Sequence, residues 1–172
     1  MLVEGGIMIA LAVILSQIKI YSAPSGGSVT AGSMIPLLLF AIKWGVGPGF
    51  VVGASYGILD FILKPYFYHP IQLILDYPLA FGLLGLAGIG HSVKDNTLKE
   101  YLLLILGVTL GIGGRMFSHV LSGVVFFAEY AGDKNPWIYS IEYNATYLIP
   151  ELIISITVLV LIWKPLKRVI KR

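Results

Sequence analysis

The chain has 172 residues, of which 57% are hydrophobic and only 12% are charged, with a mean hydropathy of +0.87. This composition excludes an ordinary soluble protein and predicts an integral membrane protein. Because one spanning helix needs about 20 apolar residues, we expect a single domain over residues 1–172 with about six spans. The absence of cysteine excludes disulfides, thiolate metal sites and cysteine nucleophiles.

Hydropathy, with glycine, proline and charge as breaks, divides the chain into apolar segments. The predicted fold is an all-α integral membrane protein of six transmembrane helices. Pro36 in the short second helix indicates either a kink or a helix that begins further upstream. The first helix has Glu4 ahead of its apolar run and Lys19 behind it, so we expect it to be retained rather than cleaved as a signal peptide. The expected helices are 2–20, 33–42, 46–63, 70–90, 101–127 and 138–163.

Lysine and arginine are unevenly divided between the expected loops. If the N-terminus is cytoplasmic, eight basic residues fall inside and three outside, so both termini are predicted to be cytoplasmic. The basic tail is then a membrane anchor, and no nucleic acid is expected as a partner. The inside set is Lys43, Lys94, Lys99, Lys164, Lys167, Arg168, Lys171 and Arg172, and the outside set is Lys19, Lys64 and Lys134.

Small residues recur along the first expected helix at Gly6, Ala10 and Ala12. Small side chains at this spacing let two helices approach closely. The pattern indicates either packing within the protein or a docking face for another membrane subunit.

Polar residues of three expected helices fall at one depth. At 1.5 Å per residue, Asp76, His119 and Asn144 each lie roughly 9 to 12 Å from the outer end of their helices. A charge in hydrocarbon costs roughly 2.5 kcal/mol or more, so a functional role is the default interpretation of Asp76. Asp76 is the one acid expected at this level. The structural alternative is a place at the water boundary, where it would favour the helix dipole.

The outer loops are rich in aromatic residues, which alone would indicate an interfacial belt. Together with the polar residues they suit a small cationic aromatic ligand. A carboxylate supplies countercharge, aromatic rings add about 0.5 to 2 kcal/mol each through cation–π contacts, and Asn144 offers a donor and an acceptor to a heterocycle.

Other chemistry has less support in the sequence. One histidine and one aspartate are too few ligands for zinc, and we expect no metal or cofactor. No hydrolase, metalloprotease or ATP-binding motif is present, so the chain cannot power transport with ATP by itself. A small membrane enzyme using Asp76 and His119 as an acid/base pair stays open. We expect Arg115 to form a structural ion pair with an acid from the set Asp60, Glu142 and Glu151.

Four segments together resemble a known family. They are residues 26–36, Tyr66 with Asp76-Tyr77 ten residues later, residues 119–127 and residues 139–144. The chain resembles the thiamine-specific substrate-binding subunit, or S-component, of bacterial energy-coupling factor transporters. The resemblance implies a multi-pass protein of the bacterial cell membrane without catalytic activity. It also implies a thiamine pocket near the outer surface, a transmembrane coupling subunit and two cytoplasmic ATPase subunits as partners. The implied ligand-binding positions are Tyr66, Asp76, Tyr77, His119, Gly123, Phe127, Tyr139 and Asn144.

The sequence departs from the family pattern at three places. Asp76 stands where the family has Glu, Phe127 stands where it has Trp, and the first outer loop lacks a tryptophan. The charge-plus-aromatic pattern is kept. An S-component for another vitamin or vitamin precursor is the first alternative.

Overall fold

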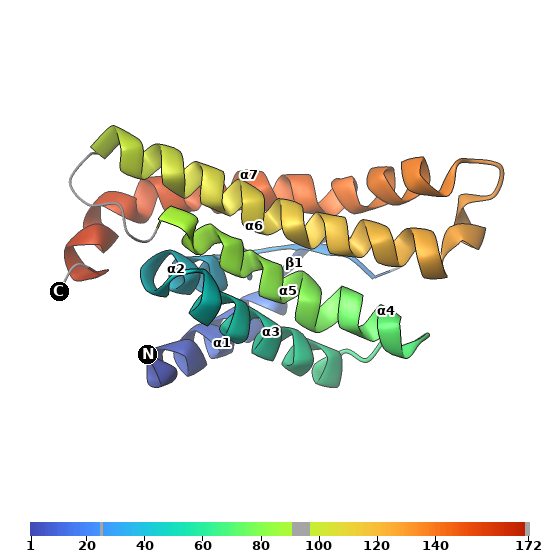
Figure 1. The fold of residues 1–172 in the computed structure, drawn as a ribbon, viewed down its shortest axis with the longest axis horizontal. Helices are drawn as coiled ribbons and strands as arrows, with labels where there is room; N and C mark the ends of the chain where they lie inside the picture. Colours follow the sequence, from blue (N-terminus) through green and yellow to red (C-terminus); the bar gives the residue numbers. More distant parts are fainter. Residues whose placement is uncertain (25, 91–96, 171–172) are drawn as a thin grey trace.

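The structure is a computed structural model that describes residues 1–24, 26–90 and 97–170. Two long helices, α6 (Thr97–Phe126) and α7 (Pro136–Ile170), run side by side along the molecule (Figure 1). The short helix η3 (Ala128–Ala131) lies between them in the chain. The N-terminus and the last described turn of α7 lie at the end of the molecule opposite this connection. Three of the basic residues expected inside, Lys94, Lys171 and Arg172, lie outside the described residues.

Within the described residues, four helical segments are long and apolar enough to cross a membrane. They are Val46–Leu63, Pro70–Ile89, Leu98–Phe126 and Pro136–Leu166. The helix α3 (Val46–Leu63) has the predicted bounds, and α7 extends beyond its predicted end. The helices α1 (Leu2–Ser16) and α2 (Ile35–Trp44) are apolar but shorter, at 15 and 10 residues.

The first expected helix was predicted too long. The helix α1 ends at Ser16, and the next residues form β1 (Lys19–Ser22), which pairs antiparallel with β2 (Ser28–Thr30). The fold is therefore mostly helical with one β-hairpin, and the all-α prediction is wrong at this point. A hairpin forms because the connection contains Pro24 and a glycine, Gly26, with a φ of 114°, which no helix accommodates.

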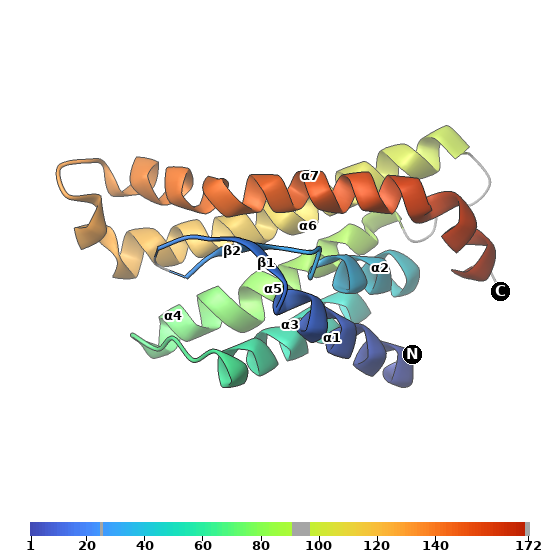
Figure 2. The same ribbon diagram turned by 180° about the vertical axis from the view of Figure 1, so that it is seen from behind.

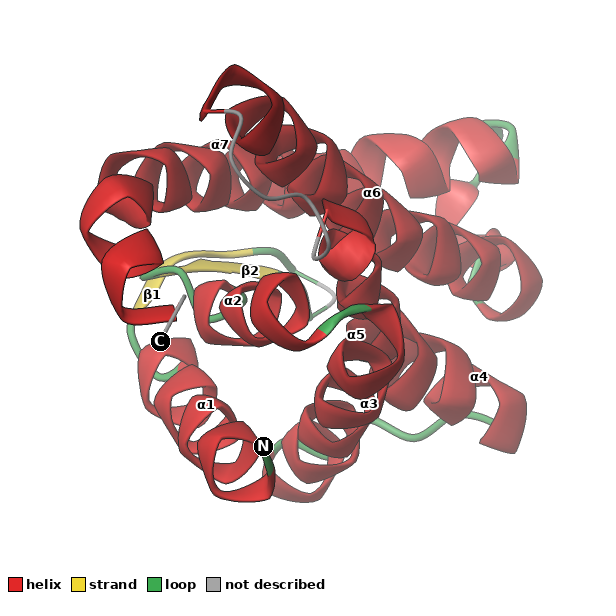
Figure 3. Ribbon diagram, turned by 60° about the vertical axis from the view of Figure 1, so that its left-hand side comes forward, coloured by secondary structure: helices red, strands yellow, loops and turns green. Residues whose placement is uncertain are grey.

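The helix α2 lies in the middle of the molecule, between the hairpin and the other helices (Figures 2 and 3). Its side chains are almost all buried, with Leu38 and Ala41 fully inaccessible. Ten residues cover only about 15 Å at 1.5 Å each, so α2 alone is too short to cross a bilayer. Pro36 lies in its first turn, where proline is tolerated, so the expected kink is absent from this described helix.

The fourth helical segment, residues 70–90, is continuous but irregular. It comprises α4 (Pro70–Ile74), the π-helical turn η1 (Leu75–Leu79), α5 (Ala80–Gly82) and the 3₁₀ helix η2 (Leu83–Gly90). Pro78 lies inside the π turn and has no N–H to donate to the preceding turn, which accounts for the widening. Widened turns of this kind occur often at functional sites. Asp76 and Tyr77 lie in this turn.

Glycines at every fourth position bring α3 against the fourth helical segment. A Cβ atom on Gly53 would overlap the carbonyl oxygen of Phe81, and one on Gly57 would overlap that of Tyr77. The two backbones are therefore in direct contact, as small residues allow in membrane helices. The spacing of Gly49, Gly53 and Gly57 was a readable signal that the sequence interpretation missed.

The small residues of α1 lie partly on a face that packs within the protein and partly on an open face. Ala12 is fully buried, whereas Gly6 and Ala10 are exposed, and beyond the backbone of its own helix no atom of the described residues lies within 4 Å of a Cβ built on Gly6. One face of α1 therefore packs within the protein and the other is open.

Replacing Gly53 with alanine is expected to destabilise the fold by about 1 to 3 kcal/mol, because the methyl group meets backbone that cannot move aside. Thermal unfolding of the purified protein in detergent measures this loss. The matched control is Gly6→Ala, which adds the same methyl group to open space. Equal melting temperatures for the two variants would contradict the close helix contact.

Candidate ligand-binding site

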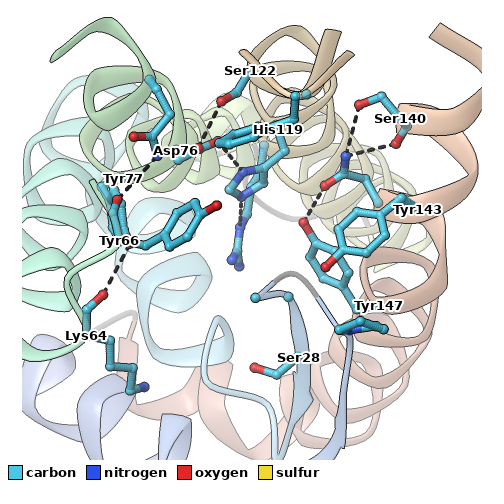
Figure 4. A pocket seen from close by; sticks show the side chains of 18 of the residues that line it. Ser28, Lys64, Tyr66, Asp76, Tyr77, His119, Ser122, Ser140, Tyr143 and Tyr147 are labelled. Atoms are coloured by element: carbon cyan, nitrogen blue, oxygen red, sulfur yellow. Dashed lines mark hydrogen bonds and ion pairs between the residues drawn. The ribbon is translucent and has the colours of Figure 1, made fainter. Parts of the chain in front are cut away.

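A cavity of about 790 Å³ lies among the helices near the connection between α6 and α7 (Figure 4). Its volume is within the range of about 300 to 1,000 Å³ of small-molecule sites. The fourth helical segment, α6, α7, the end of α3 and the hairpin contribute its walls. All eight residues singled out in the sequence line it: Tyr66, Asp76, Tyr77, His119, Gly123, Phe127, Tyr139 and Asn144.

Asp76 is held by neutral donors from two helices. Its Oδ2 accepts from Gln72 Nε2 at 2.7 Å and from Ser122 Oγ at 2.9 Å, and its Oδ1 lies 3.0 Å from His119 Nδ1. The Asp76 side chain is 16% exposed. The Asp76 carboxylate therefore lies at the cavity wall, and its charge is oriented but not neutralised by these groups.

Arg115 sets the role of the His119 ring. Its Nε–H donates to His119 Nε2 at 3.3 Å, so that nitrogen accepts. Because a neutral imidazole carries one proton, this proton then lies on Nδ1 and is donated to Asp76. The contacts therefore form a chain from Arg115 through His119 to Asp76, and Figure 4 shows the contact between His119 and Asp76.

The expected ion pair of Arg115 is wrong. Asp60 pairs with Lys64 at 3.6 Å, Glu142 pairs with Lys134 at 3.0 Å, and Glu151 accepts from Thr30 in the hairpin. Arg115 instead lines the cavity, with its guanidinium carbon 4.1 Å from the centre of the Phe81 ring. The cation–π contact with the Phe81 ring stabilises the Arg115 charge in part, in place of the expected carboxylate.

Asp60 is a second carboxylate of the cavity, so the expectation of a single acid at this level is also wrong. It lies in the last turn of α3 beside Lys64, whose Nζ also donates to Ser16 Oγ at 3.1 Å. The Asp60 charge is therefore already opposed by a cation, whereas the direct partners of Asp76 are neutral.

Aromatic rings form two groups around the cavity. Phe127 lies 5.9 Å from Tyr66 and 6.1 Å from Tyr130, measured between ring centres. On α7, Tyr139 stacks on Tyr143 at 6.4 Å. Burial, with the nearby Tyr130 and Asp76, raises the pKa of Tyr66, so its phenol stays neutral around pH 7. The rings offer faces to a flat ligand without adding charge.

Two of the expected residues use their polar groups within the protein, and a third provides space. Asn144 donates to the Ser140 carbonyl at 2.8 Å and accepts from the Tyr147 hydroxyl, so its amide is less available than expected. Tyr77 donates to the Lys64 carbonyl at 3.2 Å. A Cβ on Gly123 would overlap Ser140 Oγ, so this glycine provides space.

Several cavity residues were missed by the sequence interpretation. Gln72 and Ser122 lie one helical turn from Asp76 and His119, and their spacing along each helix was the available signal. Tyr143 and Tyr147 continue a four-residue repeat from Tyr139 along α7. Neutral polar residues and tyrosines are common in membrane helices, so composition alone did not single them out.

Comparisons with known proteins agree in covering almost the whole chain. A family model described as "Thiamine transporter protein" matches residues 2–171. The chain is 38% identical to the thiamine transporter ThiT of Bacillus subtilis, over 99% of this chain and 93% of the relative. It is 30% identical to ThiT of Lacticaseibacillus paracasei, over 91% and 83%. A solved structure of ThiT from Listeria monocytogenes superposes with a TM-score of 0.86 at 26% identity, covering 98% of this chain and 95% of that one.

Proposed function

The chain belongs to the thiamine transporter protein family, and from that premise we propose that it is the thiamine-binding subunit of an energy-coupling factor transporter in a bacterial cell membrane. Its relatives are named as transporters and not as enzymes. We therefore interpret the Asp76–His119 contact as part of a binding site, and the acid/base enzyme alternative is set aside.

The observation that carries the proposal is a carboxylate with neutral partners in a cavity walled by aromatic rings. The thiazolium ring of thiamine has a permanent positive charge that no deprotonation can remove. Moving such a charge out of water requires a negative partner from the protein. Asp76 supplies that charge, and the ring faces of Phe127 and Tyr66 supply cation–π attraction.

The remaining residues of the proposed site recognise the rest of the ligand. His119, held by Arg115, presents a ring of fixed orientation. The stacked pair of Tyr139 and Tyr143 offers a flat surface to an aminopyrimidine ring. Asn144 Oδ1 keeps one lone pair beyond its bond to the Tyr147 hydroxyl and accepts from an amino group.

The proposed orientation places both termini in the cytoplasm and the cavity toward the outside. It rests on the excess of basic residues in the expected inner loops and on the cavity lining near the connection of α6 and α7, which lies opposite the N-terminus. The open face of α1 at Gly6 and Ala10 docks on the transmembrane coupling subunit, which transmits work from two cytoplasmic ATPase subunits.

Mass spectrometry of ligand released from protein purified out of thiamine-supplied cells tests this function. We expect unmodified thiamine in about equimolar amount, since a receptor of high affinity retains its ligand through purification. Recovery of another vitamin would favour the first alternative. Recovery of a chemically altered product would favour an enzyme.

A further inference from the structure

Gln72 connects the Asp76 carboxylate to the loop before α4. Its side chain is fully buried, and its Nε2 donates to Asp76 Oδ2 at 2.7 Å. Its Oε1 accepts the backbone N–H of Tyr68 at 3.0 Å. The two ends of one amide therefore fix both the carboxylate and the loop that carries Tyr66.

Ser122 supports the same oxygen from the other side. It is 1% exposed on α6, and its Oγ donates to Asp76 Oδ2 at 2.9 Å. With Gln72 and Ser122 on Oδ2, and His119 on Oδ1, the carboxylate has little freedom to rotate. Charge-assisted bonds of this kind are roughly twice as strong as bonds between neutral groups.

We infer that Gln72 and Ser122 are positioning residues that make the site selective for a permanently charged ligand. Both donors are neutral, so they stabilise the charged carboxylate without cancelling its field. Both donors bind Oδ2 of Asp76, so the orientation of the whole carboxylate in the cavity, including that of Oδ1, is fixed. The inference rests on the proposed function, because it takes Asp76 as the counter-ion of thiamine.

Ser118 offers a matched comparison. It is also 1% exposed and lies one turn before Ser122 on α6, but its Oγ donates to the Leu75 carbonyl at 2.6 Å. Its hydroxyl stabilises the backbone of the π turn without contacting the Asp76 carboxylate. Removing the Ser118 hydroxyl therefore tests a structural role, whereas removing the Ser122 hydroxyl tests a role in recognising the ligand charge.

The experiment measures the Kd of thiamine and of an uncharged analogue, in which carbon replaces the quaternary nitrogen, by calorimetry on each variant. Ser122→Ala and Gln72→Met are each expected to weaken thiamine binding by about tenfold, because each removes a bond to a charged group. The uncharged analogue should lose less than about threefold, since it does not use the carboxylate charge. Ser118→Ala should change both affinities by the same factor.

A double-mutant cycle gives the second readout. In an Asp76→Asn background, Ser122→Ala should change thiamine affinity by less than about twofold, because the group it serves has lost its charge. Equal losses for the charged and uncharged ligands in Ser122→Ala and Gln72→Met would overturn the inference. If Asp76→Asn alone leaves thiamine binding intact, Asp76 is not the counter-ion and the proposed function is contradicted. If Asp76→Asn weakens binding but Ser122→Ala and Gln72→Met do not, the inference about Gln72 and Ser122 is contradicted and the proposed function is not.

Discussion

Asp76→Asn is expected to weaken thiamine binding by at least about 30-fold, since removing one partner of a desolvated charge pair costs about 2 to 5 kcal/mol. Asparagine keeps the shape of the side chain and removes its charge. The cavity also contains the cations Lys19 and Arg115, so loss of Asp76 leaves the ligand charge facing an excess of positive groups. An uncharged analogue should lose much less. Calorimetry with both ligands measures the difference.

The matched control for this prediction is Glu142→Gln. Glu142 lies outside the cavity lining and is paired with Lys134 in a half-exposed salt bridge. Exposed ion pairs contribute at most about 1 kcal/mol to folding stability. Because Glu142 does not line the cavity, this carboxyl-to-amide change should leave thiamine affinity unchanged. An Asp76→Asn protein that binds thiamine as tightly as the parent would show that Asp76 is not the counter-ion.

Ala10→Trp is expected to abolish thiamine uptake by cells while leaving binding to the isolated protein nearly intact. Ala10 is on the open face of α1, and α1 contributes no residue to the cavity lining. A tryptophan there prevents close approach of a partner helix without touching the ligand site. Uptake of labelled thiamine and calorimetry on the same variant measure the two effects separately.

Phe117→Trp is the control for bulk on a membrane-facing surface. Phe117 is 60% exposed on α6, and its replacement enlarges an exposed ring from benzene to indole. It should leave both uptake and binding unchanged. If Ala10→Trp instead lowers binding as much as uptake, the small-residue face serves the internal fold and is not a docking surface.

The sequence predicted most helix positions because apolar length is a strong signal in a membrane protein. The bounds of α3 were correct, and Gly45 before it and Lys64 after it explain why. The hairpin was missed because β1 continues the apolar run of α1, and hydropathy does not distinguish strand from helix there. The π turn was missed because Pro78 was read only as part of an apolar helix.

The candidate site was predictable to the extent that its residues stand out from an apolar background. Asp76, His119 and Asn144 did so, and the structure brings them to one cavity. Arg115 was assigned a partner from charge alone, but the true neighbours of a long side chain depend on packing between distant segments. Gln72 and Ser122 are neutral, and only their spacing of one helical turn from Asp76 and His119 marked them in the sequence, so their contacts with Asp76 became clear only in the structure.

An experimental structure of the protein with bound thiamine tests the central claim most directly. We expect the thiazolium ring in the cavity beside the Asp76 carboxylate, with a face of Phe127 or Tyr66 within about 6 Å of the charge. Thiamine bound outside this cavity, or bound inside it with the thiazolium turned away from Asp76, would contradict the proposed site.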